Sequence, residues 1–241
     1  MSGSGELNRV TVGDVTIGFR EWGDRSGAVI VLLHGAASSH RTWYRLVPAL
    51  VGGGYRVIAP DLRGHGGSSR PASYPLTGFR DDVIGLLDAL DLAQVTVVGH
   101  SLGAHIAGLV AQRQPARVTR LVLEDPPVPP RYPKDLNQWS GVARARLYLF
   151  GLLRQGFDRR GVASVIDQLR VPDPDWWNGL GAVTAPTLII SGGPTSHISP
   201  RWLAAVARAL PGSTLDTIPV GHRIHSLAPD RYREVVTGFL R

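Results

Sequence analysis

One short stretch limits the possible folds of this chain more than any other. An apolar run at residues 95–98 leads into Gly-His-Ser-Leu-Gly at 99–103, and small and aliphatic residues follow as far as Arg113. This pattern predicts a buried strand, a sharp turn and a helix, with Ser101 at the apex of the turn. Side chains at positions 99 and 103 would clash in so tight a turn, which explains the two glycines.

The predicted turn gives Ser101 a chemical role as well as a place. At a helix N-terminus, unpaired N–H groups and the helix dipole stabilise developing negative charge. A serine hydroxyl alone is a weak nucleophile, so the arrangement works only with a base nearby and donors for an oxyanion. The alternative is a Gly-flanked serine in an ordinary strand-to-helix turn.

Length and composition exclude several classes of protein. The 241 residues are enough for one domain with a sizeable core, with or without an insertion. Because the chain has no cysteine, it forms no disulfide, thiol nucleophile or thiolate metal site. It has no long apolar stretch and no basic and apolar leader, so we expect a cytoplasmic protein without a membrane partner. The net charge of +7 comes from scattered arginines, and we expect a solvated surface and no nucleic-acid partner.

Apolar strands alternate with helical patterns along most of the chain. This order predicts an α/β fold, a mostly parallel eight-stranded sheet with helices on both faces. Thr77 is expected to cap the helix after the fourth strand, and Ser199-Pro200 to begin a later one. The expected strands are residues 9–12, 15–22, 28–33, 55–59, 95–98, 118–123, 187–191 and 213–218.

The composition changes at Pro126. Five prolines between residues 126 and 133 preclude regular structure, and two weaker helical stretches follow at about 137–155 and 159–169. This segment is also rich in aromatic residues. We therefore expect a core of residues 1–125 and 182–241, interrupted by an insertion at 126–181.

Polar side chains follow the ends of the expected strands. Ligands of parallel sheets bind in the crevice outside the carboxyl ends of the strands, so these side chains are expected to share one crevice. They are His34, Asp61, Ser101, Glu124, Asp125, Thr195 and His222.

With these residues in view, the chain resembles the α/β-hydrolase family over nearly its whole length. Five segments match family motifs in the same order. They are His34-Gly35-Ala36, the loop of residues 61–68, the turn of residues 99–103, the strand of residues 185–190 and Gly221-His222. The resemblance also implies that residues 126–181 form a helical cap.

The resemblance implies roles for several residues. Ser101 becomes the nucleophile and His222 the general base, and the backbone N–H groups of Ala36 and Leu102 form the oxyanion hole. His225 is expected to pack or hydrogen-bond, and Asp61 to organise its loop rather than to act in catalysis. The residues expected to line the substrate site are His34, Gly35, His100, Trp139 and Trp176. No metal or other cofactor is expected.

The chain departs from the family at the triad acid, because Thr195 occupies the position where the family usually has aspartate. Loss of the orienting carboxylate costs a serine triad roughly 10⁴-fold in kcat, so a replacement is expected. Some family members place the acid after the strand that follows the nucleophile helix. Aligning Arg117-Val118 with those members puts Asp125 on the acid position, so Asp125 is the first candidate for the triad acid. Glu124 is the second candidate, and the remaining alternative is that neither residue is the acid.

The function expected from the resemblance is a cofactor-free serine hydrolase acting on a small or medium apolar carboxylic ester or lactone. The same triad also serves perhydrolysis (haloperoxidase-like), C–C bond hydrolysis or a lyase reaction. Epoxide hydrolase and haloalkane dehalogenase chemistry is disfavoured, since those relatives carry Asp where this chain has Ser101. A degraded hydrolase used as a binding module is a third interpretation. The expected partner is a small-molecule substrate, with a homodimer possible.

Overall fold

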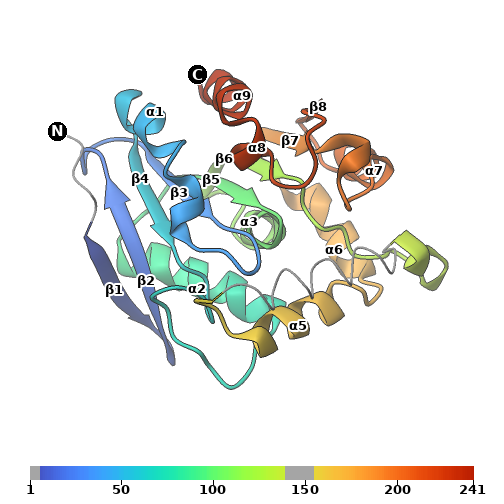
Figure 1. The fold of residues 1–241 in the computed structure, drawn as a ribbon, viewed down its shortest axis with the longest axis horizontal. Helices are drawn as coiled ribbons and strands as arrows, with labels where there is room; N and C mark the ends of the chain where they lie inside the picture. Colours follow the sequence, from blue (N-terminus) through green and yellow to red (C-terminus); the bar gives the residue numbers. More distant parts are fainter. Residues whose placement is uncertain (1–5, 139–154) are drawn as a thin grey trace.

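The computed structural model describes residues 6–138 and 155–241, and in this part the fold is one sheet covered by helices on both faces (Figure 1). The sheet has eight strands in the order β1-β2-β4-β3-β5-β6-β7-β8. The first two are antiparallel to their neighbours and the other pairs are parallel. The predicted fold class is confirmed. The strands are β1 (Leu7–Val12), β2 (Val15–Trp22), β3 (Val29–Leu33), β4 (Arg56–Pro60), β5 (Val95–His100), β6 (Val118–Glu124), β7 (Thr187–Ser191) and β8 (Ser213–Thr217).

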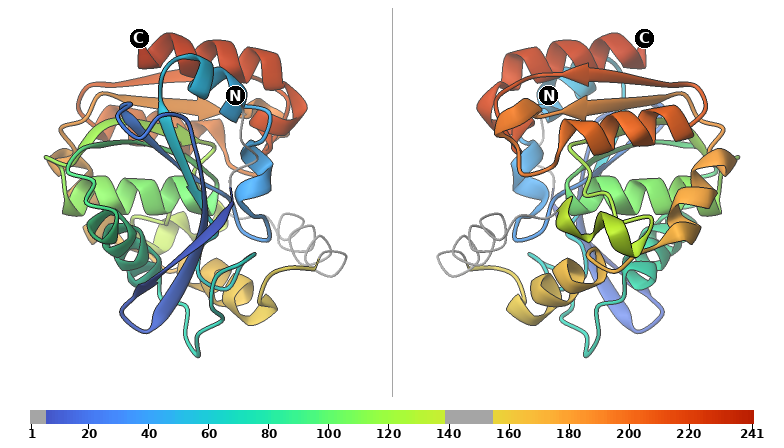
Figure 2. Two further views of the ribbon diagram at one scale, coloured as in Figure 1. Left: turned by 90° about the vertical axis from the view of Figure 1, so that its left-hand side faces the viewer. Right: turned by 90° about the vertical axis from the view of Figure 1, so that its right-hand side faces the viewer.

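The helices form two layers (Figure 2). Buried side chains of α2, α3 and α7 belong to one apolar cluster, and those of α1 and α9 to the cluster on the other face. Ser199 is the N-cap of α7, as predicted. The α-helices are α1 (Val47–Gly52), α2 (Leu76–Ala89), α3 (Leu102–Arg113), α5 (Arg159–Gln168), α6 (Pro174–Gly179), α7 (Pro200–Ala209), α8 (Ile224–Leu227) and α9 (Pro229–Leu240). The short 3-10 helices are η1 (His40–Trp43), η2 (Pro133–Gln138), η3 (Leu180–Ala182) and η4 (Gly193–Thr195).

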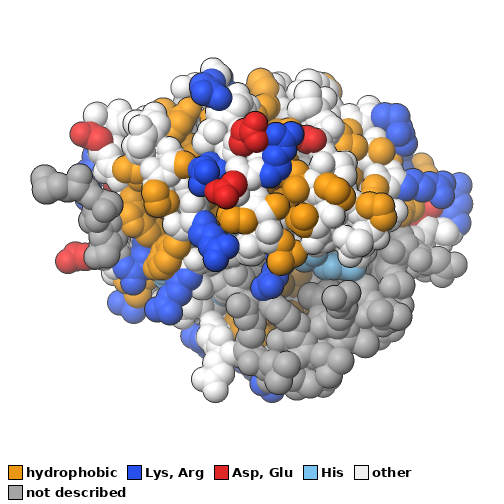
Figure 3. All heavy atoms as spheres, turned by 45° about the horizontal axis from the view of Figure 1, so that its top comes forward, with side chains coloured by type: hydrophobic (Ala, Val, Ile, Leu, Met, Phe, Trp, Pro, Cys, Tyr) orange, Lys and Arg blue, Asp and Glu red, His pale blue; other side chains and the backbone are white. Residues whose placement is uncertain are grey.

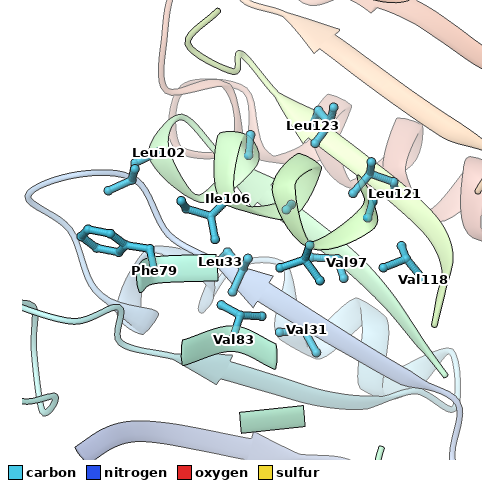
Figure 4. Packing of buried hydrophobic residues seen from close by; sticks show 14 of the residues in the cluster. Val31, Leu33, Phe79, Val83, Val97, Leu102, Ile106, Val118, Leu121 and Leu123 are labelled. Atoms are coloured by element: carbon cyan, nitrogen blue, oxygen red, sulfur yellow. The ribbon is translucent and has the colours of Figure 1, made fainter. Parts of the chain in front are cut away.

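The larger apolar cluster fixes the helix that follows Ser101. Phe79 and Val83 of α2 and Leu102 and Ile106 of α3 pack against the side chains of β3, β5 and β6 (Figure 4). Removing a side chain of this size from water contributes about 1.5–3 kcal/mol. Because Leu102 is both the first residue of α3 and part of this core, the start of the helix cannot shift without unpacking it.

The start of α2 corrects one expectation. Thr77 was predicted to cap this helix, but the helix begins at Leu76 and its N-cap is Pro75, which makes no side-chain cap bond. The N–H of Leu76 donates instead to Oε1 of Gln168 at 3.0 Å. A side chain from α5, distant in sequence, thus satisfies the helix end.

The predicted insertion is described for residues 126–138 and 155–181. Helix α5 lies where the second helical stretch was predicted. Most of the first stretch, with Trp139, lies outside the described residues. The buried side chains of α5 and α6, among them Val165 and Trp177, join the same apolar cluster as α2 and α3. The division into core and cap stays a prediction.

The surface carries charges of both signs. On the face shown in Figure 3, Lys and Arg side chains are spread over the surface, with Asp and Glu side chains and apolar atoms among them. None of the helices in the described ranges has the length and apolar character needed to cross a bilayer.

Candidate active site

Ser101 occupies a strained turn between β5 and α3. Its backbone has φ 52° and ψ −120°, a region that non-glycine residues rarely adopt and that costs about 1–3 kcal/mol. A Cβ at Gly99 would lie 2.4 Å from the Gly103 carbonyl oxygen, and one at Gly103 would lie 2.2 Å from the Leu33 carbonyl oxygen. The steric requirement predicted for both glycines is confirmed. Strain of this kind, held by surrounding packing, is typical of functional sites.

His222 bridges Ser101 and Asp125. Its Nε2 lies 2.9 Å from Ser101 Oγ, and its Nδ1 lies 2.7 Å from Asp125 Oδ2. With Nδ1–H donating to the carboxylate, Nε2 is left as an acceptor for the serine hydroxyl. The loops after β5, β6 and β8 carry the hydroxyl of Ser101, the carboxylate of Asp125 and the imidazole of His222, respectively. They bring these groups into one hydrogen-bonded line at the carboxyl ends of the strands.

Asp125 is held by the loop after β7 as well as by His222. It directly follows β6, its φ is 45°, and its side chain is fully buried. The N–H of Gly192 donates to its Oδ1 at 2.9 Å. The hydroxyl of Ser196 donates to its Oδ2 over a very short distance. The carboxylate thus accepts three hydrogen bonds in an apolar setting, which a buried charge requires.

Burial shifts the proton affinities of the pair in opposite directions. It raises the pKa of Asp125 to about 6, although the hydrogen bonds from Ser196 and Gly192 act against it. Burial, followed by the charges of His225 and Arg223, lowers the pKa of His222 to about 3. His222 is therefore neutral at pH 7 and able to accept a proton.

Glu124, the second candidate for the acid, pairs with a different histidine. Its carboxylate accepts from the backbone N–H of His225 at 2.9 Å and from His225 Nδ1 at 2.8 Å. Burial acts to raise the pKa of Glu124, but the charges of His225 and His100 and the bonds from His225 outweigh it and hold that pKa below its usual value. The structure brings Asp125, not Glu124, to His222.

His100 lies beside the pair of Glu124 and His225, and the three residues form a cluster of the kind that can bind a metal ion. Among the described residues, His100, Glu124 and His225 have side chains of ligating type, with ligand atoms within 4.8 Å of one another. Glu124 and His225 already bond to each other, and His225 Nε2 lies 2.5 Å from Thr42 Oγ1. The arrangement is that of a buried hydrogen-bonded cluster behind the His222 loop.

The substitution Glu124→Gln distinguishes the role of Glu124 from that of Asp125. Loss of one partner of a buried pair is expected to lower the free energy of unfolding by about 3 kcal/mol. Turnover per folded molecule should fall far less than in Asp125→Asn, because an amide at position 124 leaves the bond from His222 to Asp125 in place. Urea unfolding and initial rates measure the two quantities, and a Glu124→Gln loss of turnover equal to that of Asp125→Asn would contradict the assignment.

The loop after β3 lies against Ser101. A Cβ at Gly35 would be 2.7 Å from His100 Nδ1 and 3.2 Å from Ser101 Cβ, so any other residue there would have to displace these neighbours. The loop is held by two histidines: His34 Nε2 accepts from Leu62 N–H at 2.9 Å, and His65 Nε2 accepts from Ala37 N–H at 3.1 Å. The backbone between these anchors carries Ala36, one of the two residues expected in the oxyanion hole. Leu102, the other, begins α3.

The residues expected to line the substrate site differ in their surroundings. His34 is fully buried, and His100 is turned inward, where its Nε2 donates to the His222 carbonyl oxygen at 2.9 Å. Trp176 stacks on His105 of α3 with ring centroids 5.5 Å apart and is 5% exposed, so it packs between α6 and α3. Bulk and aromatic character suggested a binding role for Trp176, but the same properties suit a core position. Trp139 lies outside the described residues.

Two residues of the site were not singled out from the sequence. Ser196 contacts Asp125, and the ring of His197 lies 3.9 Å from that of His222, centroid to centroid. Both belong to the segment where Thr195 replaces the usual acid. The sequence shows only a serine next to the position where the family has its acid. This serine gains a meaning when the fold brings it to Asp125.

Curated relatives cover parts of the chain. It is 37% identical over 134 residues to a non-heme chloroperoxidase of Streptomyces lividans, a match that covers 54% of this chain and 49% of the relative. It is 29% identical over 214 residues to an epoxide hydrolase of Caballeronia sordidicola, covering 86% of this chain and 60% of the relative. The chain thus spans about half the length of these curated relatives.

Solved structures match almost the whole fold. A hydrolase from Pseudomonas aeruginosa superposes with a TM-score of 0.82 at 24% identity, covering 99% of both chains. An enol-lactonase from Burkholderia xenovorans gives 0.79 at 22% identity, covering 97% of this chain and 99% of the other. The family described as alpha/beta hydrolase fold matches residues 28–153, more than half of the sequence. With its eight-stranded sheet and strained serine turn, the chain is a member of the alpha/beta hydrolase family.

Proposed function

We propose that the protein is a serine hydrolase that cleaves a small or medium apolar carboxylic ester or lactone through an acyl-enzyme. The single observation that carries this proposal is the hydrogen-bonded line Ser101–His222–Asp125, with separations of 2.9 and 2.7 Å. The chain belongs to a family of hydrolases, which supports the general class. The ester or lactone substrate is the finer part of the proposal.

In the first half of the reaction, Ser101 Oγ attacks the carbonyl carbon while His222 Nε2 takes its proton. Asp125 holds the imidazole in the required tautomer and stabilises the imidazolium that forms. The N–H groups of Ala36 and Leu102 stabilise the negative oxygen of the tetrahedral intermediate. His222 then gives its proton to the departing alkoxide, which leaves as an alcohol.

In the second half, water replaces the alcohol. His222 takes a proton from the water, and the resulting hydroxide attacks the acyl carbon bound to Ser101. The intermediate collapses, the carboxylic acid leaves, and Ser101 recovers its proton from His222. In a lactone the alcohol and the acid belong to one molecule, so the product is a single hydroxy acid.

The similarity to a chloroperoxidase favours one second candidate, perhydrolysis on the same acyl-enzyme. Hydrogen peroxide would take the place of water and the product would be a peracid. The similarity to epoxide hydrolases supports no such candidate, because attack of Ser101 on an epoxide would form an ether. An ether has no carbonyl carbon for water to attack, so the enzyme would not be regenerated.

The pH dependence of the rate follows from the pair that Asp125 forms with His222. Activity requires a neutral imidazole and an ionised carboxylate. Since the pKa of Asp125 is raised to about 6, activity is expected to be full above this pH and to fall as the pH drops through it. A profile of kcat/KM between pH 4 and 9 measures this limb, and a rate that stays constant down to pH 4 would count against it.

The proposal as a whole is tested with a panel of short and medium acyl esters and lactones, each assayed with and without peroxide. Turnover in water supports the hydrolase, and faster peracid formation than acid formation supports the second candidate. Absence of turnover on all substrates, with no covalent labelling of Ser101 by a fluorophosphonate, would overturn both and favour a binding module.

A further inference from the structure

The hydroxyl of Ser196 and the imidazole of His222 meet at one atom. Asp125 Oδ2 accepts from His222 Nδ1 at 2.7 Å and from Ser196 Oγ over a shorter distance. Ser196 Oγ is itself an acceptor, for the N–H of Ile198 at 3.0 Å. Because an ionised carboxylate can only accept, the hydroxyl hydrogen of Ser196 is directed to Asp125, and a lone pair on the serine oxygen remains for the N–H of Ile198.

The loop that carries Ser196 also touches the loop that carries His222. The N–H of Gly221 donates to the Gly192 carbonyl oxygen at 2.9 Å, and a Cβ at Gly192 would lie 2.4 Å from the Gly221 carbonyl oxygen. The N–H of Gly192 holds the other oxygen of Asp125. The segment after β7 thus contacts both oxygens of the acid and the backbone beside the base.

We propose that Ser196 is a positioning residue for the reaction, which keeps the carboxylate of Asp125 ionised and aimed at His222. The inference rests on the proposed function, since it concerns the same triad. The position of the acid at the end of β6 explains why a second donor is needed. An acid at this place is buried among apolar strands, and a second charge-assisted donor offsets the cost of keeping it charged.

The charged and titratable groups around Asp125 determine how loss of the hydrogen bond from Ser196 would change the pH dependence of the rate. His222 and His197 face the carboxylate, while His225 and Arg223 act on the His222 side. The Ser196 hydroxyl is neutral at all working pH values, so its removal changes no charge. The bond from Ser196 lowers the pKa of Asp125 against the effect of burial. Its loss therefore moves the acid limb of the rate to higher pH.

The test compares Ser196→Ala with Ser196→Thr and with Ser199→Ala. Ser196→Ala is expected to lower kcat about tenfold, the effect of losing one hydrogen bond to a charged group, with KM unchanged because the Ser196 hydroxyl is taken up by Asp125 and by the N–H of Ile198. Its acid limb should move upward in pH. Ser196→Thr keeps the hydroxyl and should keep the wild-type profile, and Ser199→Ala, three residues away at the start of α7, controls for changes in the loop.

A second measurement needs no turnover. The His222 Nδ1 proton should give a downfield resonance in the proton NMR spectrum of the resting protein, assigned by its loss in His222→Gln. Without the competing donor, Asp125 Oδ2 becomes the stronger acceptor for that proton, so the resonance should move further downfield in Ser196→Ala. An unchanged resonance with an unchanged pH limb would overturn the role of Ser196. Failure of the wild-type protein to hydrolyse any ester would instead count against the proposed function, while the resonance still tests the contact.

Discussion

Ser101→Ala is expected to remove almost all ester turnover and to leave only the residual catalysis that substrate binding and the oxyanion hole supply. The loss should be on the order of 10⁶-fold in kcat, because alanine at position 101 has no hydroxyl with which to form the acyl-enzyme. The fold should persist, since the substitution removes only the oxygen, and the surrounding core of α3 does not depend on it. Initial rates on the best substrate of the ester panel measure this effect.

The exposed serine Ser26 supplies the matched control for this result. Its side chain is exposed and bonds to the nearby Asp24 on the surface, so Ser26→Ala should keep wild-type rates. Thermal unfolding of both variants shows that any difference in rate belongs to the site and not to the stability. Turnover by Ser101→Ala within tenfold of the wild-type rate would refute the nucleophile.

Asp125→Asn is expected to lower kcat by about 10⁴-fold, the loss seen when an orienting carboxylate becomes an amide. The reason lies in the three donors that face this side chain. Gly192 N–H points at one oxygen, and His222 Nδ1–H and Ser196 O–H point at the other. An amide has one oxygen and one NH₂ group. Whichever way the amide is turned, its NH₂ group therefore faces a hydrogen-bond donor of the protein.

Either orientation of an amide at position 125 disturbs the site. With its NH₂ group toward His222, the imidazole is driven to the wrong tautomer and Nε2 no longer accepts the proton of Ser101. With its NH₂ group toward Gly192, the loop after β7 loses its bond to the side chain. Steady-state kinetics of Asp125→Asn beside Glu124→Gln decides the matter, and equal rates for Asp125→Asn and wild type would show that the acid lies elsewhere.

The fold and the turn at Ser101 could be predicted because their signals are local. A strand of β-branched residues, two glycines that tolerate no Cβ and a serine between them define the turn at Ser101 from a short segment. Alternating apolar residues predict the first two strands, and continuous apolar runs predict most of the others. Physical requirements of this kind can be read from adjacent residues without knowing what packs against them.

Contacts between distant segments were harder to predict. The choice between Glu124 and Asp125 depends on which way each side chain points from the end of β6, and adjacent residues point in opposite directions. The bond from Gln168 to the start of α2, and that from Ser196 to Asp125, join residues 92 and 71 positions apart. The periodicity of apolar residues in the sequence does not indicate which distant residues form such pairs. The packing of Trp176 has the same character, since its partner His105 lies on another helix.

The central claim is that Ser101 is activated by His222 and Asp125. The most direct test is the rate and site of covalent labelling by a fluorophosphonate, followed by intact mass and by peptide mapping. We expect one adduct per chain on the peptide that contains Ser101, no adduct in Ser101→Ala and greatly slowed labelling in Asp125→Asn. An adduct on a different residue, or labelling of Asp125→Asn at the wild-type rate, would contradict the account.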